Sequence, residues 1–285
     1  MTRALISAPG FYPALTPEQY FAEPCPAPAL TNSGIRTLLT SCPAKFAYGH
    51  PAIGQPAEEQ QSTVARRLGN LVHRLALGKG SEYEISPHDA FRSKEAKAWK
   101  DEVESAGKLP VKPAEFEQAS EMAARIKEAI EAETRGHDYE TEVVIAWRHP
   151  QWGFWCRAMI DVWCPTLNLA LDVKTCADAS DQAVGRAFAG GYAGQHAWYG
   201  DGLQAINGEA PIFGFLFVEN AAPFLSRFAE PSEAFRHGAA IANSRGAGMF
   251  SACLDAGEWP GYAPFKAQPP SWWLNQITDL ELEAV

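Results

Sequence analysis

The chain has 285 residues, of which 46% are hydrophobic and 20% are charged, a composition that suits a globular protein with one large core or two modest ones. No apolar run approaches the roughly 20 residues that cross a bilayer, and residues 1–10 lack the apolar stretch of a signal peptide, so we expect a cytoplasmic protein with no membrane partner. The formal net charge of −10 argues against a protein that coats nucleic acid through its overall charge, but it allows a local basic groove.

Residues 1–30 are rich in proline and aromatic side chains, and we expect an extended arm with little regular structure there. We interpret residues 31–285 as one domain that opens with a helix capped by Thr31-Asn32-Ser33. None of the six cysteines forms a C-x-x-C pair, which argues against a zinc ribbon or an iron–sulfur cluster.

A second helix is predicted over residues 62–77 from apolar side chains at helical spacing. His73 falls opposite this apolar stripe, and Gly69, one turn earlier, leaves space beside its imidazole. A histidine at such a position is also consistent with an ordinary solvated side chain. Arg66 and Arg74 lie in the same segment and either face solvent or line a basic groove.

Residues 81–135 predict a helical insertion, with helices at about 93–105 and 113–133. The period of the pattern then changes to that of strands at about 141–147, 154–163 and 169–175. Turns rich in proline and glycine or asparagine separate these strands, which indicates an antiparallel meander.

A helix at about 192–206 and an apolar run at 212–218 follow the meander, so we expect a strand–helix–strand crossover to a parallel strand. The fold class is therefore α/β, with a central mixed sheet flanked by helices. A long helix at about 230–254 and an aromatic, proline-rich tail end the chain.

Asp172-Val173-Lys174 is the most informative feature of the sequence. In a strand, the side chains at i and i+2 point to the same face, so an apolar run here presents a carboxylate and an ammonium together. Unpaired buried charge is expensive. Either the two side chains pair with each other, or the carboxylate holds a metal ion while the lysine faces an anionic substrate.

Asp161 lies near the end of the preceding strand, where the register of the meander brings it beside Asp172. Two carboxylates suffice to hold Mg²⁺, and a nearby lysine stabilises charge that develops on phosphorus. The backbone carbonyl of Val173 is a further candidate ligand. These groups are the parts that phosphodiester hydrolysis requires.

Gln195 and Tyr199 lie one turn apart on the helix that follows and share one of its faces. The pair is suited to phosphate or base contacts next to an active strand. A surface glutamine beside a core tyrosine explains the same spacing equally well.

Taken together, these residues resemble the PD-(D/E)XK nuclease superfamily, and within it the phage-type exonuclease branch of exodeoxyribonuclease VIII. The resemblance covers most of the chain, including residues 30–34, 42–46 and 259–262. It implies a restriction-endonuclease-like core. The residues that carry it are Gly69 with His73, Glu142, Asp161, the run Asp172-Val173-Lys174-Thr175, and Gln195 with Tyr199.

The resemblance implies a role for each of these residues. Asp161 and Asp172 would ligate Mg²⁺, or Mn²⁺ as a substitute, with the Val173 carbonyl and His73 completing the protein shell. Lys174 would position the attacking water. The other catalytic candidate is Glu142, in a supporting role, and the DNA-binding candidates are Gln195 and Tyr199.

The implied activity is that of an exodeoxyribonuclease on double-stranded DNA ends, which digests one strand from 5′ to 3′ and leaves a 3′ overhang. The resemblance further implies a homo-oligomeric ring and a single-strand annealing recombinase as partner. Arg66 and Arg74 would line the lumen of such a ring. Alternatives are a structure-specific or nicking endonuclease, an inactive DNA-binding module of this fold, and a mere ion pair between Asp172 and Lys174.

Overall fold

The computed structural model of the chain describes residues 5–54 and 64–283, with backbone alone at residues 64–66 and 278–283. A seven-stranded mixed sheet forms its centre. In spatial order its strands are β1 (Gly10–Tyr12), β5 (Glu140–Arg148), β6 (Trp155–Cys164), β7 (Leu169–Cys176), β8 (Ile212–Glu219) and β9 (Ser226–Ala229), with β2 (Ala29–Leu30) beside β6.

The predicted meander is confirmed, because β5, β6 and β7 pair antiparallel in chain order. Between β6 and β7 the chain makes one turn of 3₁₀-helix, η1 (Pro165–Leu167), which ends at Asn168 in the left-handed conformation. The predicted crossover is also confirmed, since β7 pairs parallel with β8. The connection contains α7 (Asp181–Ala187), the π-helical turn η2 (Phe188–Tyr192) and α8 (Ala193–Asn207).

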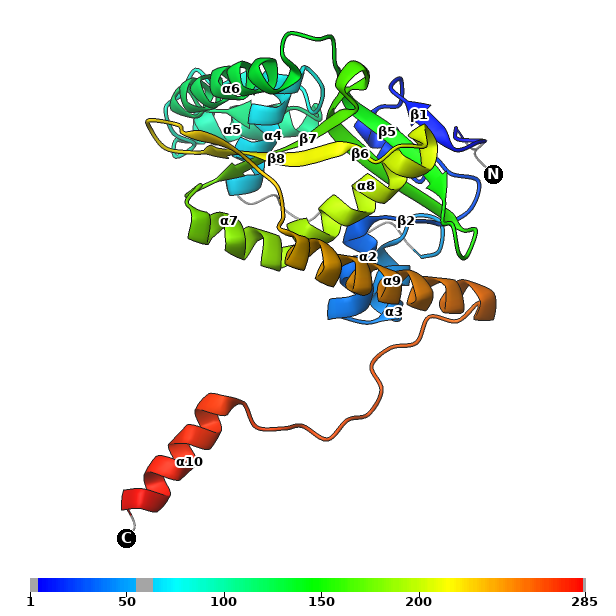
Figure 1. The fold of residues 1–285 in the computed structure, drawn as a ribbon. Coiled ribbons are helices and arrows are strands. Elements are labelled where there is room, and N and C mark those ends of the chain that lie inside the picture. The colour runs from blue at the N-terminus through cyan, green and yellow to red at the C-terminus, as the bar shows by residue number, and fades with distance from the viewer. Residues whose placement is uncertain (1–4, 55–63, 284–285) are drawn as a thin grey trace.

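Helices cover both faces of the sheet (Figure 1). On one face, α8 packs with α2 (Asn32–Thr40), α3 (Pro43–Gly49) and α9 (Glu233–Ala256) around a large aromatic core. On the other face, α4 (Val64–Leu77) packs against α6 (Pro113–Thr134), and both bury apolar side chains on β7 and β8. The sheet is buried on both sides, which explains the continuous apolar runs of β7 and β8.

The insertion at residues 81–135 is more than helical. Besides α5 (Lys94–Ser105) and α6, it contains a separate two-stranded parallel sheet of β3 (Tyr83–Ile85) and β4 (Leu109–Val111), which the sequence analysis did not predict. Strands of three residues are too short for a periodic pattern to reveal.

The N-terminal arm was expected to hold little regular structure, and this expectation is wrong. β1 pairs with β5, and β2 pairs with β6. Between β1 and β2 in the chain lies α1 (Pro17–Phe21), which begins with a capping box at Thr16. Ile6 and Tyr20 are buried against the sheet. The proline and aromatic content indicated an irregular segment, but tertiary pairing with the sheet edges decided the outcome.

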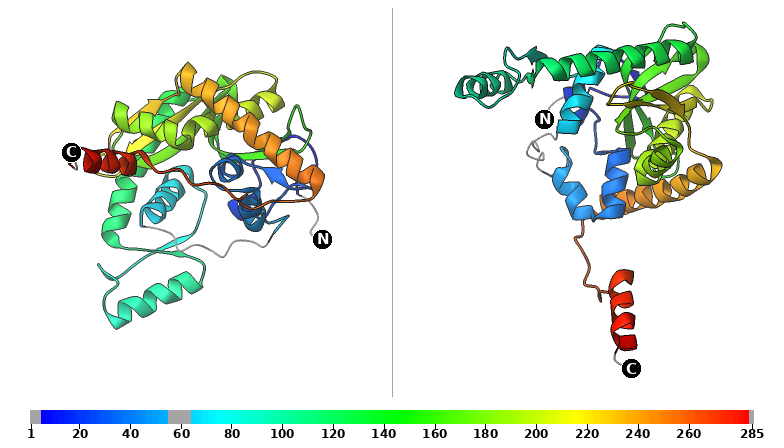
Figure 2. Two further views of the ribbon diagram at one scale, coloured as in Figure 1. Left: turned by 90° about the horizontal axis from the view of Figure 1, so that it is seen from below. Right: turned by 90° about the vertical axis from the view of Figure 1, so that its left-hand side faces the viewer.

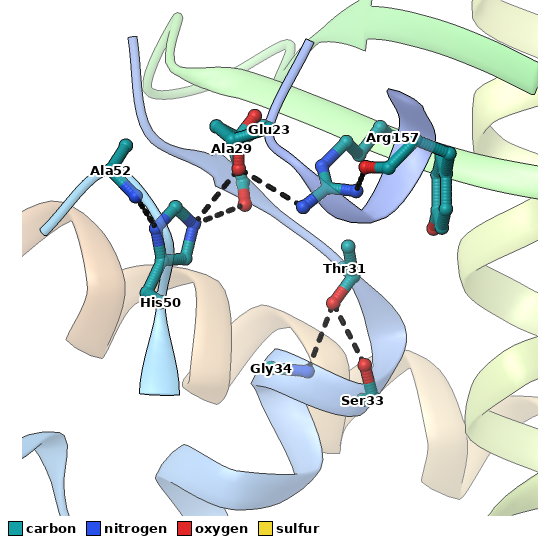
Figure 3. Close-up of polar contacts among 9 residues, drawn as sticks. Glu23, Ala29, Thr31, Ser33, Gly34, His50, Ala52 and Arg157 are labelled. Atoms are coloured by element: carbon teal, nitrogen blue, oxygen red, sulfur yellow. Dashed lines mark hydrogen bonds and ion pairs between the residues drawn. The ribbon is translucent and has the colours of Figure 1, made fainter. Parts of the chain in front are cut away.

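A buried charge cluster fastens this arm to the sheet (Figure 3). Arg157 on β6 donates a hydrogen bond of 3.0 Å from Nη2 to Glu23 Oε2, and its guanidinium carbon lies 4.6 Å from the centre of the Tyr20 ring. His50 Nε2 lies 3.1 Å from the same Glu23 oxygen and 3.1 Å from the carbonyl of Ala29. We call Glu23, Arg157 and His50 the arm cluster.

The C-terminal part leaves the body after α9. Trp259 stacks on Phe46 at 5.3 Å between ring centres, and the chain then runs to α10 (Ser271–Glu283), which lies apart from the body in Figure 1 and in the right-hand view of Figure 2. Among the described residues, no helix is long and apolar enough to cross a bilayer. The six cysteines are all free thiols.

Candidate active site

The candidate site forms where two strands of the meander separate. The paired register of β6 and β7 ends at Val162 opposite Leu171, one step before Asp161 and Asp172. From there the Asp161 side chain takes the place of a backbone partner, because its Oδ2 accepts a hydrogen bond of 2.7 Å from the Val173 amide. The separation of the strands therefore brings both carboxylates into one gap in the sheet.

The alternation of β6 side chains between the two faces of the sheet also changes at this level. Ile160 packs in the core with α8 and α9, whereas Val162, which simple alternation would place on the same face, packs in the core with α4 and α6. Glu142 on β5 lies at the same level, between the pairs Thr141–Val162 and Val143–Ile160. Its backbone adopts a φ of +49°, a left-handed conformation that is rare for a non-glycine residue inside a strand.

Such strained backbone occurs mainly where function demands it. The Glu142 carboxylate is buried, and its Oε1 lies 3.8 Å from Nδ1 of His73 on α4. The sequence matched Glu142 to a family glutamate but carried no sign of the left-handed turn. In the structure, the Glu142 carboxylate lies beside the imidazole of His73.

Asp172 and Lys174 point to the same face of β7, as alternation predicts. The Lys174 ammonium forms an ion pair with Asp172 Oδ1 and lies 4.9 Å from the centre of the Tyr192 ring. Burial lowers the pKa of Lys174, but the carboxylates of Asp172 and Asp161 raise it by more, so the net shift is upward and the lysine stays charged. Gln195 on α8 donates a hydrogen bond from Nε2 to Asp172 Oδ2.

His73 is not a solvated surface residue. Its Nε2 donates a hydrogen bond of 3.2 Å to the Val173 carbonyl and lies 3.9 Å from Asp161 Oδ2. Burial lowers the pKa of His73, but Asp161, Glu142 and Asp172 together raise it to about 9. Gly69 lies beside β7, since a Cβ there would lie 3.5 Å from Thr175 Oγ1 on β7. That distance is an ordinary van der Waals contact, so the packing of α4 on β7 does not require a glycine at this position.

Negative charge predominates in this gap. Burial and the neighbouring Asp172 raise the pKa of Asp161 to about 7, although His73 and Lys174 oppose that shift. Asp172 is 2% exposed, and its Oδ1 touches the lysine but accepts no hydrogen bond of good geometry. Two close, buried carboxylates fit a bound cation.

The donors present suit a hard divalent ion. Asp161, Asp172 and the Val173 carbonyl offer oxygen atoms, which Mg²⁺ prefers, and such an ion keeps several waters of its own. Across residues 5–54 and 64–283, no three side chains of His, Cys, Asp or Glu converge into a ready-made metal cage. His73 remains a predicted ligand, but its imidazole would first have to lose the proton that the raised pKa holds on it, and a neutral imidazole suits Zn²⁺ better than Mg²⁺.

The predicted DNA-binding residues lie in different settings. Gln195 is at the site, on Asp172, and Tyr199 lies beside Gln195, where it is half-buried and stacks on Phe213 at 5.8 Å between ring centres. Arg74 forms an ion pair with Glu82 and donates a hydrogen bond of 2.8 Å to the Gly78 carbonyl. Arg66 lies in α4, but its side chain falls outside the described residues.

Sequence reasoning missed the contacts that hold Glu142 in place. Lys79 Nζ donates hydrogen bonds of 2.6 Å to the Thr141 carbonyl and 3.1 Å to the Pro13 carbonyl, and Thr141 Oγ1 donates one of 2.9 Å to the Leu77 carbonyl. They latch the end of α4 to β5 directly beside Glu142. The signal was Gly78-Lys79-Gly80, in which both glycines have positive φ, +77° and +113°, and so shape a tight loop around the lysine.

Comparison with known proteins places the chain in a family. Residues 32–264 match the model of DUF3799, a PDDEXK-like domain of unknown function. Among solved structures, a proposed exonuclease from Eubacterium rectale shares the fold, with a TM-score of 0.61 and 16% identity over 93% of this chain and 97% of that one. The search of curated proteins finds no match. The chain belongs to the PDDEXK-like family DUF3799, and its core has the fold of PD-(D/E)XK nucleases.

Proposed function

We propose that the protein is a metal-dependent nuclease that hydrolyses DNA phosphodiesters. One observation carries the proposal: carboxylates from adjacent strands, Asp161 and Asp172, meet in a gap of the sheet with the Lys174 ammonium on Asp172. A divalent ion held by the two carboxylates would supply a polarised phosphoryl oxygen and an acidified water.

The chain's own residues orient the reacting groups. Lys174 is charged and held over Tyr192, so its ammonium is placed to stabilise negative charge as it develops on the phosphate. Gln195 fixes the rotamer of Asp172 through a hydrogen bond, and the Val173 amide fixes that of Asp161. Glu142 orients His73, whose positive charge offsets part of the carboxylate charge.

The finer proposal is a Mg²⁺-dependent exodeoxyribonuclease, with Mn²⁺ as a substitute, that digests one strand of linear duplex DNA from 5′ to 3′ and leaves a 3′ overhang. Its support is the sequence resemblance to the exodeoxyribonuclease VIII branch, and a proposed exonuclease with the same fold agrees with it. The same resemblance supports action at DNA ends, as a homo-oligomeric ring, with an annealing recombinase for phage-type recombination.

End-labelled linear duplex tests the proposal. With Mg²⁺ or Mn²⁺ we expect a label at a 5′ end to be released at once in a short product and a strand labelled at its 3′ end to shorten stepwise, with no loss of either label in the presence of a chelator and no cleavage of covalently closed circular duplex. Lys174→Gln should abolish cleavage, whereas Lys127→Gln, on the exposed face of α6, should leave it unchanged.

Each alternative function predicts a different result for cleavage and for metal binding. Cleavage of the circular duplex would indicate an endonuclease. Calorimetric binding of Mn²⁺ without cleavage of any DNA would indicate an inactive module of this fold. Absence of both binding and cleavage would leave Asp172 and Lys174 as a structural ion pair and would refute the proposal.

We further propose that Arg66 and Arg74 contact the DNA backbone. Reversal of both charges to glutamate should weaken DNA binding and flatten its dependence on salt, because fewer counterions are released on binding. The Arg74 guanidinium already pairs with Glu82, so Glu82→Gln, which frees that guanidinium, should strengthen binding. Unchanged binding in the charge-reversed variant contradicts this role.

A further inference from the structure

The segment after residue 264 lies outside the match to the family and exposes an unusual amount of apolar surface. Phe265 is 85% exposed, Trp272 is 62% exposed and Trp273 is 45% exposed. Large aromatic side chains that gather on a surface mark sites of association, and tryptophan is enriched among residues that dominate binding energy. The helix α10, which carries both tryptophans, therefore has the character of a binding element.

The residues just before this segment are hydrogen-bonded to the body, and α10 lies apart from it. The Ala44 amide donates a hydrogen bond of 3.1 Å to the Pro260 carbonyl, and the Tyr262 hydroxyl lies 2.9 Å from Ser41 Oγ. Pro264, Pro269 and Pro270 then stiffen the connection to α10. Figure 1 and the right-hand view of Figure 2 show α10 directed away from its own body.

The body has a groove of matching chemistry. A cavity of about 340 Å³ lies between α2, η2 and α9, and its walls are mainly apolar. Arg36 is exposed and lies against Gly191, where a Cβ would come within 3.6 Å of its Nη1. No carboxylate in the described part of the chain pairs with this guanidinium. The apolar side chains of the groove include Ile35, Leu39, Phe188 and Phe235.

The charge of α10 is complementary to that of the groove. The sequence of α10 contains Asp279, Glu281 and Glu283 and has no lysine or arginine. An aromatic and acidic helix is therefore complementary to an apolar groove with one unpaired arginine at its mouth. Because α10 turns away from its own body, the groove that it meets belongs to another molecule.

We propose that α10 of one copy docks into the α2–η2–α9 groove of a second copy of this chain. Helix and groove are different surfaces, so the contact is heterologous, and it closes into a ring if the rotation between copies allows it. This inference does not depend on nuclease activity.

Mass in solution, measured by light scattering across a dilution series, tests the contact. The full chain should associate, and Trp272→Ala with Trp273→Ala should weaken self-association at least about 30-fold, as expected when anchor tryptophans are truncated. A full chain that stays monomeric at all concentrations, or a double variant with unchanged mass, overturns the proposal.

The groove can be blocked without disturbing the fold. Gly238 lines it from α9, and a Cβ there meets open space, so Gly238→Leu fills the groove and suits a helix. This variant should lose self-association to the same extent as the tryptophan variant. The matched control is Ala240→Leu, which adds apolar bulk to the exposed face of the same helix outside the groove and should associate like the full chain.

A mixing experiment separates this contact from any other mode of association. The Gly238→Leu variant keeps its helix, and the tryptophan variant keeps its groove, so the two together should form a 1:1 complex although each alone is monomeric. Failure of the mixture to associate, when each variant remains folded by circular dichroism, overturns the assignment of the groove.

Discussion

Strand β6 carries two buried charge clusters four residues apart, and they differ in their balance. The arm cluster joins one arginine, Arg157, to one carboxylate, Glu23, with His50 beside them, so its charges cancel. At the candidate site, the carboxylates of Asp161, Asp172 and Glu142 face one lysine and one histidine.

This difference in charge balance distinguishes a cluster that stabilises the fold from one that is suited to bind an ion. In the arm cluster, opposite charges hold two segments together, and neither needs an outside ion. At the site, two carboxylates share one gap, which raises the pKa of Asp161 to about 7 through burial and the charge of Asp172. An excess of buried negative charge is costly in the protein alone and becomes useful when a cation binds. Substitutions in the two clusters should therefore have opposite consequences.

The largest effect is expected at the site. Asp161→Asn keeps the shape and the acceptor for the Val173 amide but removes a charge that would hold the metal ion. Cleavage of linear duplex should fall at least about 1000-fold, comparable with the loss of a group that stabilises the transition state. Single-turnover kinetics with Mg²⁺ measures the effect. A variant within tenfold of the wild-type rate contradicts the assignment of Asp161.

The next effect is expected in the arm cluster. Arg157→Met leaves Glu23 buried without its cation, so the free energy of unfolding should fall by about 3–5 kcal/mol. Denaturant unfolding measures the loss. The double variant Glu23→Gln with Arg157→Met is the control, since it removes both charges and should recover most of the stability. Equal stability of the single and double variants shows that the pair does not act as a unit.

The pH dependence of stability distinguishes the clusters further. A carboxyl whose folded pKa is raised contributes stability that is full below its unfolded pKa of about 4 and is lost as the pH rises through about 7. The amide introduced by Asp161→Asn cannot ionise, so with a chelator present this variant should exceed the wild type by up to about 4 kcal/mol near pH 8 and match it near pH 4. A difference that does not change with pH argues against the raised pKa.

The smallest effect is expected at the latch beside Glu142. Lys79→Met removes the donor to the Thr141 and Pro13 carbonyls, so we expect a loss of about 1 kcal/mol in stability and a roughly tenfold slower cleavage. Lys108→Met is the control, because it removes only an exposed pair with Glu84. If Lys79→Met affects stability without affecting the rate, the latch holds the arm and does not position Glu142.

The meander, the crossover and the shared face of Asp172 and Lys174 could be predicted because they follow from local pattern. Alternation and turn residues define β5, β6 and β7, and the spacing of Asp172 and Lys174 places both on one face. The residues 1–30 could not be placed in the same way. Their three-residue and two-residue strands exist only because the edges of β5 and β6 pair with them.

The sequence by itself determined which chemical groups stand on which strand, because side-chain direction repeats every two residues in a strand. Only the tertiary structure decided that β6 separates from β7 at Asp161, that Glu142 turns to the left-handed conformation opposite it, and that α4 brings His73 to the Val173 carbonyl. These features depend on contacts between segments far apart in the chain, and the free energy of such contacts leaves no local pattern to read.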